Sequence, residues 1–506
     1  MGQNKVVSRT HKAKMNMFFS LLSQCVSFVC GLIVPQLMIN TFGSEAYGAT
    51  ASISNFLSYV VLLEGGMGAV TRSALYKAFA NKSIIQISSI VCETKSFFRK
   101  IAIGFIVYVL IIAIFFKQIS HNDVFDYWYS FSLVIVIALS TFAEYFIGIS
   151  YSVLLQADQV GYIGIIFKII TTILNTIGIV VLVSLGCDIL SVKLLSSIVF
   201  VLKPVLLSIY VKKRYKLVEV ESNTKYLKNK GTALGQHIAW TIHNNTDITV
   251  LTLFKDLSLV SVYSVHYMVV SQLQNLLSSF TTGMEAVFGS MHANKEKDNL
   301  QQTFGYYETL ISIISITVFS AAAILFVPFI RLYTAGITDA QYINSPFAFA
   351  LIIASLLYIL RTPYGHMIIA AGRFKETRIA AYGEAIINIV VSIVLVIQYG
   401  LVGVAIGTVL ATLFRFVYYA IYLSKHVLYR SIIKWIKRMI INSVVFGCAF
   451  IIGQNILSLF NINSYAEWIV AGITIVAITG VLTILLNTIL YKNDVFAIIR
   501  KMKKTA

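Results

Sequence analysis

One apolar stretch of the sequence is interrupted by HNNTDITVLT, whose first five side chains are all polar. His243 and Asp247 are four residues apart, so on a helix they share a face and can hydrogen-bond. A histidine beside a carboxylate titrates near physiological pH, so the pair is a candidate for binding a substrate or a proton. Asn244 and Asn245 add amide groups beside the pair. The alternative is a structural cluster of hydrogen bonds between membrane helices, in which each bond stabilises the protein by only about 0.6 kcal/mol.

Other polar and ionisable residues also lie inside or beside apolar stretches. A charge near the centre of a bilayer costs about 2.5–3.5 kcal/mol, so such a residue usually faces protein or a water-filled cavity. The candidates for binding a substrate in a cavity are Gln24, Arg72, Lys77, His243, Asn244, Asn245, Arg361 and Arg415. The candidates for coupling transport to a proton are Glu64, Asp247 and Glu285.

Three of these basic residues have alternative interpretations. Arg72 and Lys77 follow LLEGGMGAV, whose glycines allow bending or close backbone approach beside Glu64, but both are also suited to anchoring a helix end at the inner surface. Arg361 lies two residues before Pro363, which frees a backbone carbonyl and bends a helix. An arginine at a broken helix suits a phosphate, and the alternative is a salt bridge with Glu384 or Glu144.

The composition places these residues in a membrane protein. The 506 residues are 58% hydrophobic and 12% charged, with a mean hydropathy of +0.81. Soluble domains are about 45–50% apolar and about 25% charged. Apolar stretches of roughly twenty residues recur along the chain, and each matches a hydrocarbon core of about 30 Å. The first of them is too long for a signal peptide, so we expect it to persist in the mature protein.

Apolar runs between polar breaks predict fourteen membrane-spanning helices. They lie near residues 15–40, 47–68, 99–117, 127–150, 162–184, 188–211, 232–254, 258–288, 306–330, 345–370, 378–398, 401–424, 439–459 and 466–491. With the N-terminus inside, most of the 40 Lys and Arg residues fall in inner links, whereas the outer links hold only Lys117, Lys255 and Arg331. The positive-inside rule therefore predicts that both termini are cytoplasmic.

The links between the predicted helices exclude several functions. They are too short to fold as a catalytic domain. The formal net charge of +19 is spread over these links rather than over one folded face, so we expect lipid headgroups and no nucleic acid as partners. The five cysteines are scattered without metal-ligand spacing, and we expect neither a metal nor a cofactor.

The two halves of the sequence align at a shift of 213 residues, which matches odd-numbered helices with odd-numbered helices. The best match pairs LLQADQVGYIGIIFKII with the stretch around IIAAGRFKETRIAAYGE, and Gly186 meets Gly400 after a one-residue insertion. This pattern predicts a parallel repeat around a central cavity. The predicted organisation is an N-terminal lobe (1–211), a basic cytoplasmic linker (212–231), a C-terminal lobe (232–424), and two final helices with a cytoplasmic tail (425–506).

Several segments resemble one family of membrane proteins. They are FGSEAYGA with FLSYVVLLEGGMGAVTRSALYK, LLQADQVGYI, HIAWTIHNNTDITVLT, SVYSV and GLVGVAIGT. Their order, with the fourteen helices and the repeat, is similar to the polysaccharide repeat-unit flippases of the multidrug/oligosaccharidyl-lipid/polysaccharide (MOP) superfamily. Unlike related peptidoglycan-precursor flippases, the first predicted helix contains no arginine, so their phosphate-binding arginines are not carried over.

The resemblance implies a function in the bacterial plasma membrane. It implies that an undecaprenyl-pyrophosphate-linked oligosaccharide is moved from the inner to the outer leaflet by alternating access, for assembly into a surface polysaccharide. The expected partners are this lipid-linked oligosaccharide, membrane lipids and the polysaccharide polymerase machinery. A cavity lined by Arg and Lys would replace the water around the charged diphosphate.

Two other functions are compatible with parts of the sequence. A multidrug or cation antiporter of the same superfamily would favour an acidic or aromatic cavity, and the buried acids and bases are nearly balanced in number. A membrane polymerase or ligase would need a large outer loop with catalytic groups, and the outer link HNDVFDYW offers only isolated acidic residues. A transporter that is not an enzyme is therefore the prediction.

Overall fold

The computed structural model describes residues 9–120, 124–218, 234–281 and 283–490. Within these ranges the secondary structure is helical and contains no β-strand, so the chain is an all-α membrane protein. It divides into two compact units, Met1–Ser261 and Val262–Ala506. The predicted linker 212–231 lies mostly outside the described residues, and the boundary between the units falls after it.

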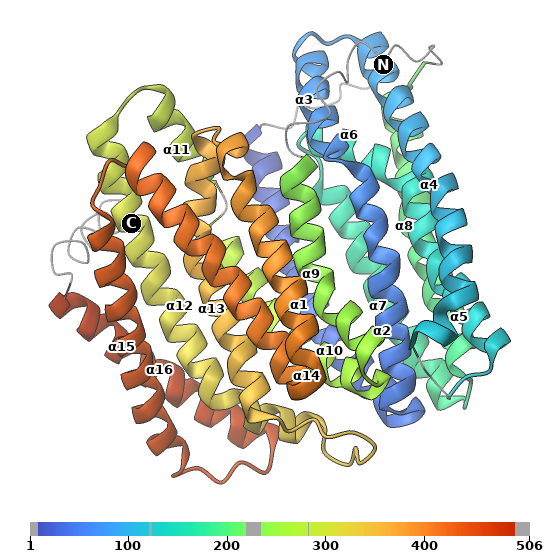
Figure 1. The fold of residues 1–506 in the computed structure, drawn as a ribbon. Helices are drawn as coiled ribbons and strands as arrows, with labels where there is room; N and C mark the ends of the chain where they lie inside the picture. Colours follow the sequence, from blue (N-terminus) through green and yellow to red (C-terminus); the bar gives the residue numbers. More distant parts are fainter. Residues whose placement is uncertain (1–8, 121–123, 219–233, 282, 491–506) are drawn as a thin grey trace. The chain divides into compact units, whose positions relative to one another are not determined.

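The first unit contains nine α-helices and two irregular helical turns within the described ranges (Figure 1). They are α1 (Arg9–Phe42), α2 (Ser44–Ser58), the 3₁₀-helix η1 (Tyr59–Glu64), α3 (Met67–Ala80), α4 (Ile84–Ser120), α5 (Tyr127–Ala143), the π-helix η2 (Glu144–Gly148), α6 (Ile149–Ala157), α7 (Tyr162–Ser184), α8 (Ile189–Tyr215) and α9 (Leu234–Phe254). Helices α1, α7, α8, α5 and α4 pack successively against one another, and α9 packs on α2 and η1.

The second unit is built around α12. Its helices are α10 (Leu257–Ser279), which starts at the unit boundary, α11 (Met284–Ala293), α12 (Lys297–Tyr333), α13 (Ser345–Ala370), α14 (Phe374–His426), α15 (Ile432–Leu457) and α16 (Tyr465–Leu490). Helix α12 packs against α13, α15 and α16, while α13 packs along α14. The last two helices are thus part of the unit's core rather than a peripheral tail.

Eleven helical segments in the described ranges are long and apolar enough to cross a membrane. One of them, α14, contains two predicted spans, because Gly400 breaks its helical geometry with φ 53° and ψ −126°. Helices α9 and α10 are also long enough but carry too many polar residues to be counted by hydropathy. Each of the fourteen predicted spans therefore coincides with a helix. The predicted segment 258–288 is wrong at its end, because α10 stops at Ser279 and α11 starts at Met284.

The sequence repeat reappears in the backbone. Helices α4 and α12 both contain 37 residues, and their first residues are separated by 213. Three turns in the first half have a residue with positive φ exactly where the corresponding turn of the second half has one, at the same shift. These pairs are Lys82 and Lys295, Gln159 and Gly372, and Lys216 and Tyr429. Gly186 and Gly400 form a fourth pair at the insertion.

Hydrogen bonds at these turns repeat as well. The Val160 amide donates to the Leu155 carbonyl, and the Arg373 amide donates to the Ile368 carbonyl in the equivalent position. This pattern closes a helix with a residue in the left-handed conformation. The two halves of the chain therefore follow the same local backbone path even where their side chains differ.

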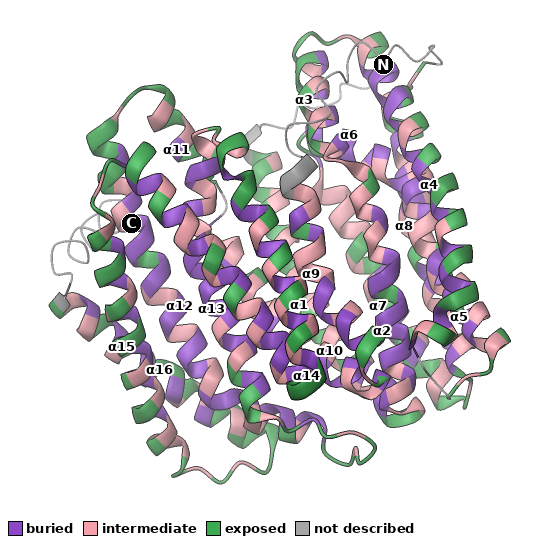
Figure 2. Cartoon of the chain, viewed as in Figure 1, coloured by how far each residue is buried: buried purple, intermediate pink, exposed green. Residues whose placement is uncertain are grey.

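Exposed residues recur along the helices (Figure 2), and many of them are large and apolar. Ile103, Val107 and Ile111 recur every four residues on α4, and each is at least half exposed. Helix α14 carries a similar stripe through Ile386, Val390 and Val394. Large exposed apolar surfaces are rare on soluble proteins, whereas a lipid environment accepts them. These stripes are consistent with helices that face a bilayer.

Close packing between the two segments of α14 yields a stability prediction. A Cβ atom on Gly407 would collide with the Ser392 side chain and lie 3.0 Å from its backbone nitrogen. We expect Gly407→Val to destabilise the protein by about 1–3 kcal/mol, the usual cost of overpacking. Thermal unfolding of the purified protein in detergent measures this effect. Gly447→Val is the control because a Cβ atom there meets no atom within 4 Å, and equal losses for both variants would contradict the packing argument.

Candidate functional site

A seam of amides and hydroxyls joins α2 to α9. The Asn55 amide donates to Asn245 Oδ1 at 3.0 Å, and Ser58 donates to the same oxygen at 2.8 Å. Thr249 donates to Asn55 Oδ1 at 3.0 Å and hydrogen-bonds the Tyr59 hydroxyl at 2.9 Å. These five residues, which we call the α2–α9 seam, come from positions about 190 apart in sequence. The seam is polar but contains no formal charge.

The other predicted residues of α9 lie around this seam. Asp247 is buried, and His243, one turn before it, is half-buried. Asn244 donates to the Trp240 carbonyl of its own helix at 2.7 Å and does not take part in the seam. Asn245 of the predicted polar run thus connects α9 to α2 through its side chain.

The second membrane segment is broken beside Glu64. Helix α2 tightens into η1, and Gly65 and Gly66 then adopt positive φ values of 57° and 76°. Glycine reaches this backbone region without a steric cost, so the glycine-rich sequence accounts for the break. The Tyr145 hydroxyl of η2 donates to Glu64 at 2.5 Å. Glu64, a predicted coupling residue, therefore lies where the helix is interrupted, and it accepts a hydrogen bond from the π-helix η2.

Three basic side chains form a row along α6 and η2. Arg72 of α3 donates to Gln156 at 3.0 Å. Lys95 of α4 lies 3.5 Å from the Tyr151 hydroxyl, and Arg99 of α4 lies 4.8 Å from the centre of the Phe146 ring. We call Arg72, Lys95 and Arg99 the basic row. No described acidic side chain lies within ion-pair distance of any of the three.

The repeat places acidic or neutral residues where the basic row has its charges. At a shift of 213 residues, Lys95 corresponds to Glu308 and Arg72 to Glu285. Tyr151, which contacts Lys95, corresponds to Tyr364. The tyrosine is thus retained in both halves while the charge beside it is reversed. This contrast follows from the aligned sequence, although only the structure shows which charges lack a partner.

A separate, half-buried ion pair lies in the first unit. Lys203 of α8 contacts Glu144 at 2.9 Å, where η2 begins. Gly148 lets the two helices approach, because a Cβ atom there would lie 2.9 Å from Pro204. A π-helix and a proline therefore face each other across this pair. Such irregular turns are frequent at functional positions.

In the second unit, Glu384 of α14 is fully buried between two arginines. Arg361 of α13 and Arg415 of α14 each donate to one of its carboxylate oxygens. The Arg415 guanidinium also donates to the Tyr419 hydroxyl at 2.8 Å. The salt bridge between Arg361 and Glu384, which was the alternative to a phosphate site, is therefore present.

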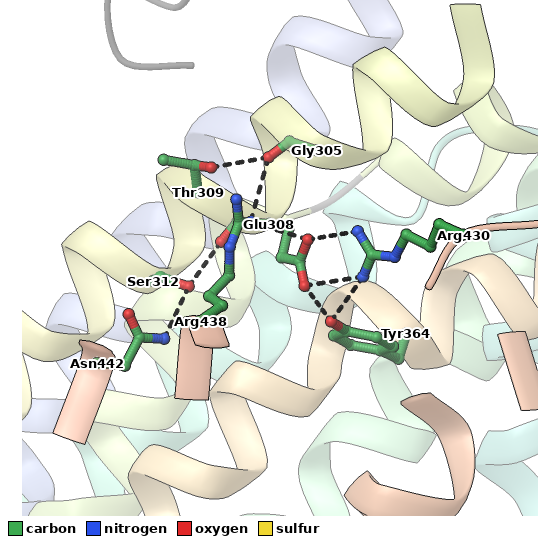
Figure 3. A network of polar contacts seen from close by, with 8 residues as sticks. All are labelled: Gly305, Glu308, Thr309, Ser312, Tyr364, Arg430, Arg438 and Asn442. Carbon is green, nitrogen blue, oxygen red and sulfur yellow. Dashed lines mark hydrogen bonds and ion pairs between the residues drawn. The ribbon is translucent and has the colours of Figure 1, made fainter. Parts of the chain in front are cut away.

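A second carboxylate in this unit also binds two arginines (Figure 3). Arg430 donates to both oxygens of Glu308 at 2.8 and 3.0 Å. Arg438 of α15 lies 2.8 Å from the same carboxylate, and the Tyr364 hydroxyl of α13 donates to it. Asn442 extends the contacts by donating to Ser312 at 3.4 Å. This Glu308 network joins α12, α13 and α15.

The remaining predicted residues lie apart from these clusters. Gln24 is half-buried on α1, Lys77 is exposed on α3, and Glu285 is exposed on α11. Within each unit the structure thus brings together only some of the predicted site, namely Asn245 with the seam, Arg72 with the basic row, and Arg361 with Arg415. Lys95 and Arg430 fall in predicted inner links and Arg99 is the first residue of a predicted span, and no local sequence signal distinguishes them from ordinary anchors. In the part of the chain that is described, no group of His, Cys, Asp and Glu residues is suited to a metal ion.

Comparisons with known proteins identify the fold. No family model matches the chain, and no curated protein matches its sequence. Among solved structures, the lipid II flippase MurJ in an inward closed conformation matches with a TM-score of 0.70 and 17% identity, over 94% of this chain and 99% of MurJ. An inward-facing multidrug resistance MATE family transporter of the MOP superfamily matches with a TM-score of 0.62 and 14% identity, over 79% and 95%. The eukaryotic MATE transporter AtDTX14 matches with a TM-score of 0.56 and 13% identity, over 82% and 96%.

These similarities extend over most of the chain. The protein therefore has the multi-pass α-helical fold of MOP-superfamily transporters and flippases, and these structural neighbours are transport proteins rather than enzymes. At such low identity the comparison establishes the fold and leaves the cargo to be inferred from this chain's own residues.

The Glu308 network generates a stability prediction. Glu308→Gln keeps the shape of the side chain but leaves two buried arginines without a counter-charge, so we expect a loss of about 3–5 kcal/mol. Glu376→Gln is the matched control, because Glu376 pairs with Arg373 at 3.1 Å on an exposed surface, where an ion pair contributes only about 0–1 kcal/mol. Thermal unfolding in detergent compares the two variants. Similar melting temperatures would show that burial does not make Glu308 special.

Proposed function

We propose that this protein is a flippase for an undecaprenyl-diphosphate-linked oligosaccharide. It would move the repeat unit from the inner to the outer leaflet of a bacterial plasma membrane by alternating access, for surface polysaccharide synthesis. The observation that carries the proposal is the basic row, in which three bases have no acidic partner among the described residues. A diphosphate needs such groups because it cannot enter a low-dielectric region without replacing its water.

Four arginines of the second unit differ from the basic row because each is paired with a carboxylate. Arg361 and Arg415 share Glu384, and Arg430 and Arg438 share Glu308. Their charges are largely satisfied inside the second unit, so they serve mainly to hold its helices together. This difference favours the first unit as the one that binds phosphate, and it moves Arg361 from a substrate contact to a structural role.

The α2–α9 seam suits the sugar part of such a cargo. Its side chains are amides and hydroxyls, which can hydrogen-bond sugar hydroxyls as readily as one another. Because these groups already satisfy each other at 2.8–3.0 Å, they remain stable when no cargo is bound. Exchange of partners would then cost little free energy.

Two further arguments support this cargo. The residues that resemble polysaccharide repeat-unit flippases include the glycine-rich segment before Arg72 and the polar run of α9. Among the structural neighbours, the one with a TM-score of 0.70 is named a lipid II flippase. With the termini in the cytoplasm, as the distribution of Lys and Arg predicts, the basic row would lie near the inner leaflet where the cargo is made.

A multidrug or cation antiporter is the second candidate. It is favoured by the buried Asp247 and by Glu64 beside the broken segment, because a cation would bind a carboxylate rather than a row of bases. Several structural neighbours are named as MATE transporters. The two candidates differ in which residues the transport of each cargo requires.

Removal of the basic row tests the flippase. We expect Arg72→Gln, Lys95→Gln and Arg99→Gln each to reduce flipping of a fluorescent polyprenyl-diphosphate oligosaccharide in proteoliposomes by about tenfold or more, since a hydrogen bond to a charged group contributes about 1.5–3 kcal/mol. Lys100→Gln is the control, because Lys100 is an exposed neighbour on α4 outside the row. Unchanged flipping in the three variants would contradict the proposed role of the basic row. Efflux of an organic cation by the native protein and by the variants, with no flipping by the native protein, would favour the antiporter.

Energy coupling is tested at the two carboxylates. If protonation of Asp247 or Glu64 drives the exchange between inward and outward states, Asp247→Asn and Glu64→Gln should abolish transport while the protein stays folded. The amount of surface polysaccharide in cells that lack the native gene and express each variant measures transport, and size-exclusion chromatography checks folding. Normal polymer in cells with either variant would exclude that carboxylate from coupling.

A further inference from the structure

An apolar groove lies between α4 and α5 of the first unit. It has a volume of about 250 Å³ and is lined only by apolar side chains. Phe105, Val109 and Ala138 form its buried floor, while Ile106, Leu110 and Leu139 form an exposed rim. The groove is therefore open along the outer surface of a helix pair, next to the exposed apolar residues Ile103, Val107 and Ile111 of α4.

The groove begins where the basic row ends. Arg99 packs over the Phe146 ring at 4.8 Å, and Phe146 stacks on Phe142 with ring centres 5.4 Å apart. Phe142 is one of the residues that line the groove. A continuous path of contacts thus connects the last base of the row to the apolar surface.

The order of charge and apolar surface along α4 matches an amphiphilic molecule. At a rise of about 1.5 Å per residue, Phe105 lies roughly 9 Å beyond Arg99 and Leu110 roughly 16 Å beyond it. Since the N-terminal end of α4 is predicted to be cytoplasmic, a ligand with its phosphate at Arg99 would extend its tail toward the bilayer centre. This is the direction of a lipid tail in the inner leaflet.

We propose that this groove binds the first isoprene units of the polyprenyl carrier while its diphosphate contacts the basic row. This inference rests on the proposed function and adds a position for the tail. Its volume of about 250 Å³ suits a short stretch of a single branched chain better than the two acyl chains of a phospholipid. Three bases without an acidic partner among the described residues also match the charge of a diphosphate better than the single charge of a phosphodiester.

Binding of undecaprenyl diphosphate to the full-length protein in nanodiscs, measured by native mass spectrometry, tests the groove. Leu110→Trp narrows its rim at an exposed position, where a larger side chain does not disturb folding. We expect about a tenfold loss of bound carrier, because one or two methylene groups would lose their burial. Ala138→Leu places a larger side chain at the bottom of the groove and should also reduce the amount of bound carrier. Ile111→Trp, on the neighbouring exposed position of α4 outside the groove, should leave binding unchanged.

Three results would overturn the assignment. Unchanged binding in Leu110→Trp would show that the tail lies elsewhere, and an equal loss in Ile111→Trp would show a general effect of the membrane surface. Equal binding of dioleoyl phosphatidic acid, equally reduced by Leu110→Trp, would show that the groove holds ordinary acyl lipids. If the Arg99→Gln variant no longer binds the carrier while the Leu110→Trp variant still does, the groove does not bind the tail, and the proposed function is unaffected. If the native protein binds no carrier, the proposed function fails as well.

Discussion

Neutralisation of buried carboxylates is the interaction on which the second unit depends. An ionised group inside a membrane protein is stable only when it is paired and hydrogen-bonded. Glu308 and Glu384 each meet this requirement with two arginines from other parts of the chain. Because Arg438 lies on α15 while Glu308 lies on α12, the same contacts that satisfy the charge also hold one of the last two helices in place (Figure 3).

The two halves of the repeat have similar backbone turns but different charged side chains. Equivalent turns, such as those at Gln159 and Gly372, have the same handedness and hydrogen bonds in both halves. The side chains beside the retained tyrosines nevertheless differ, with Lys95 in one half and Glu308 in the other. Glu308 pairs with two arginines, whereas Lys95 has no acidic partner among the described residues. The same local backbone path therefore carries ion pairs between helices in the second unit and bases that can bind a ligand in the first unit.

Irregular helices concentrate in the first unit near the residues proposed for transport. The break at Gly65 and Gly66 lies beside Glu64, and the π-helix begins at Glu144. The glycine-rich sequence predicted the first of these features because glycine reaches positive φ without steric cost. The π-helix was not predicted, since the sequence around Glu144 is compatible with an ordinary α-helix, and the close approach of Gly148 to Pro204 is seen only in the tertiary structure.

The sequence alone determined the membrane class, the fourteen helical segments and the repeat, because apolar length and turn residues are local properties of the chain. It also proposed the pair of Arg361 and Glu384. Only the tertiary structure decided which bases are paired. Arg430 and Arg438 lie in a predicted inner link, yet both contact Glu308 more than 120 residues away. Their pairing depends on how each helix is rotated against its neighbours, and no short stretch of sequence specifies that rotation.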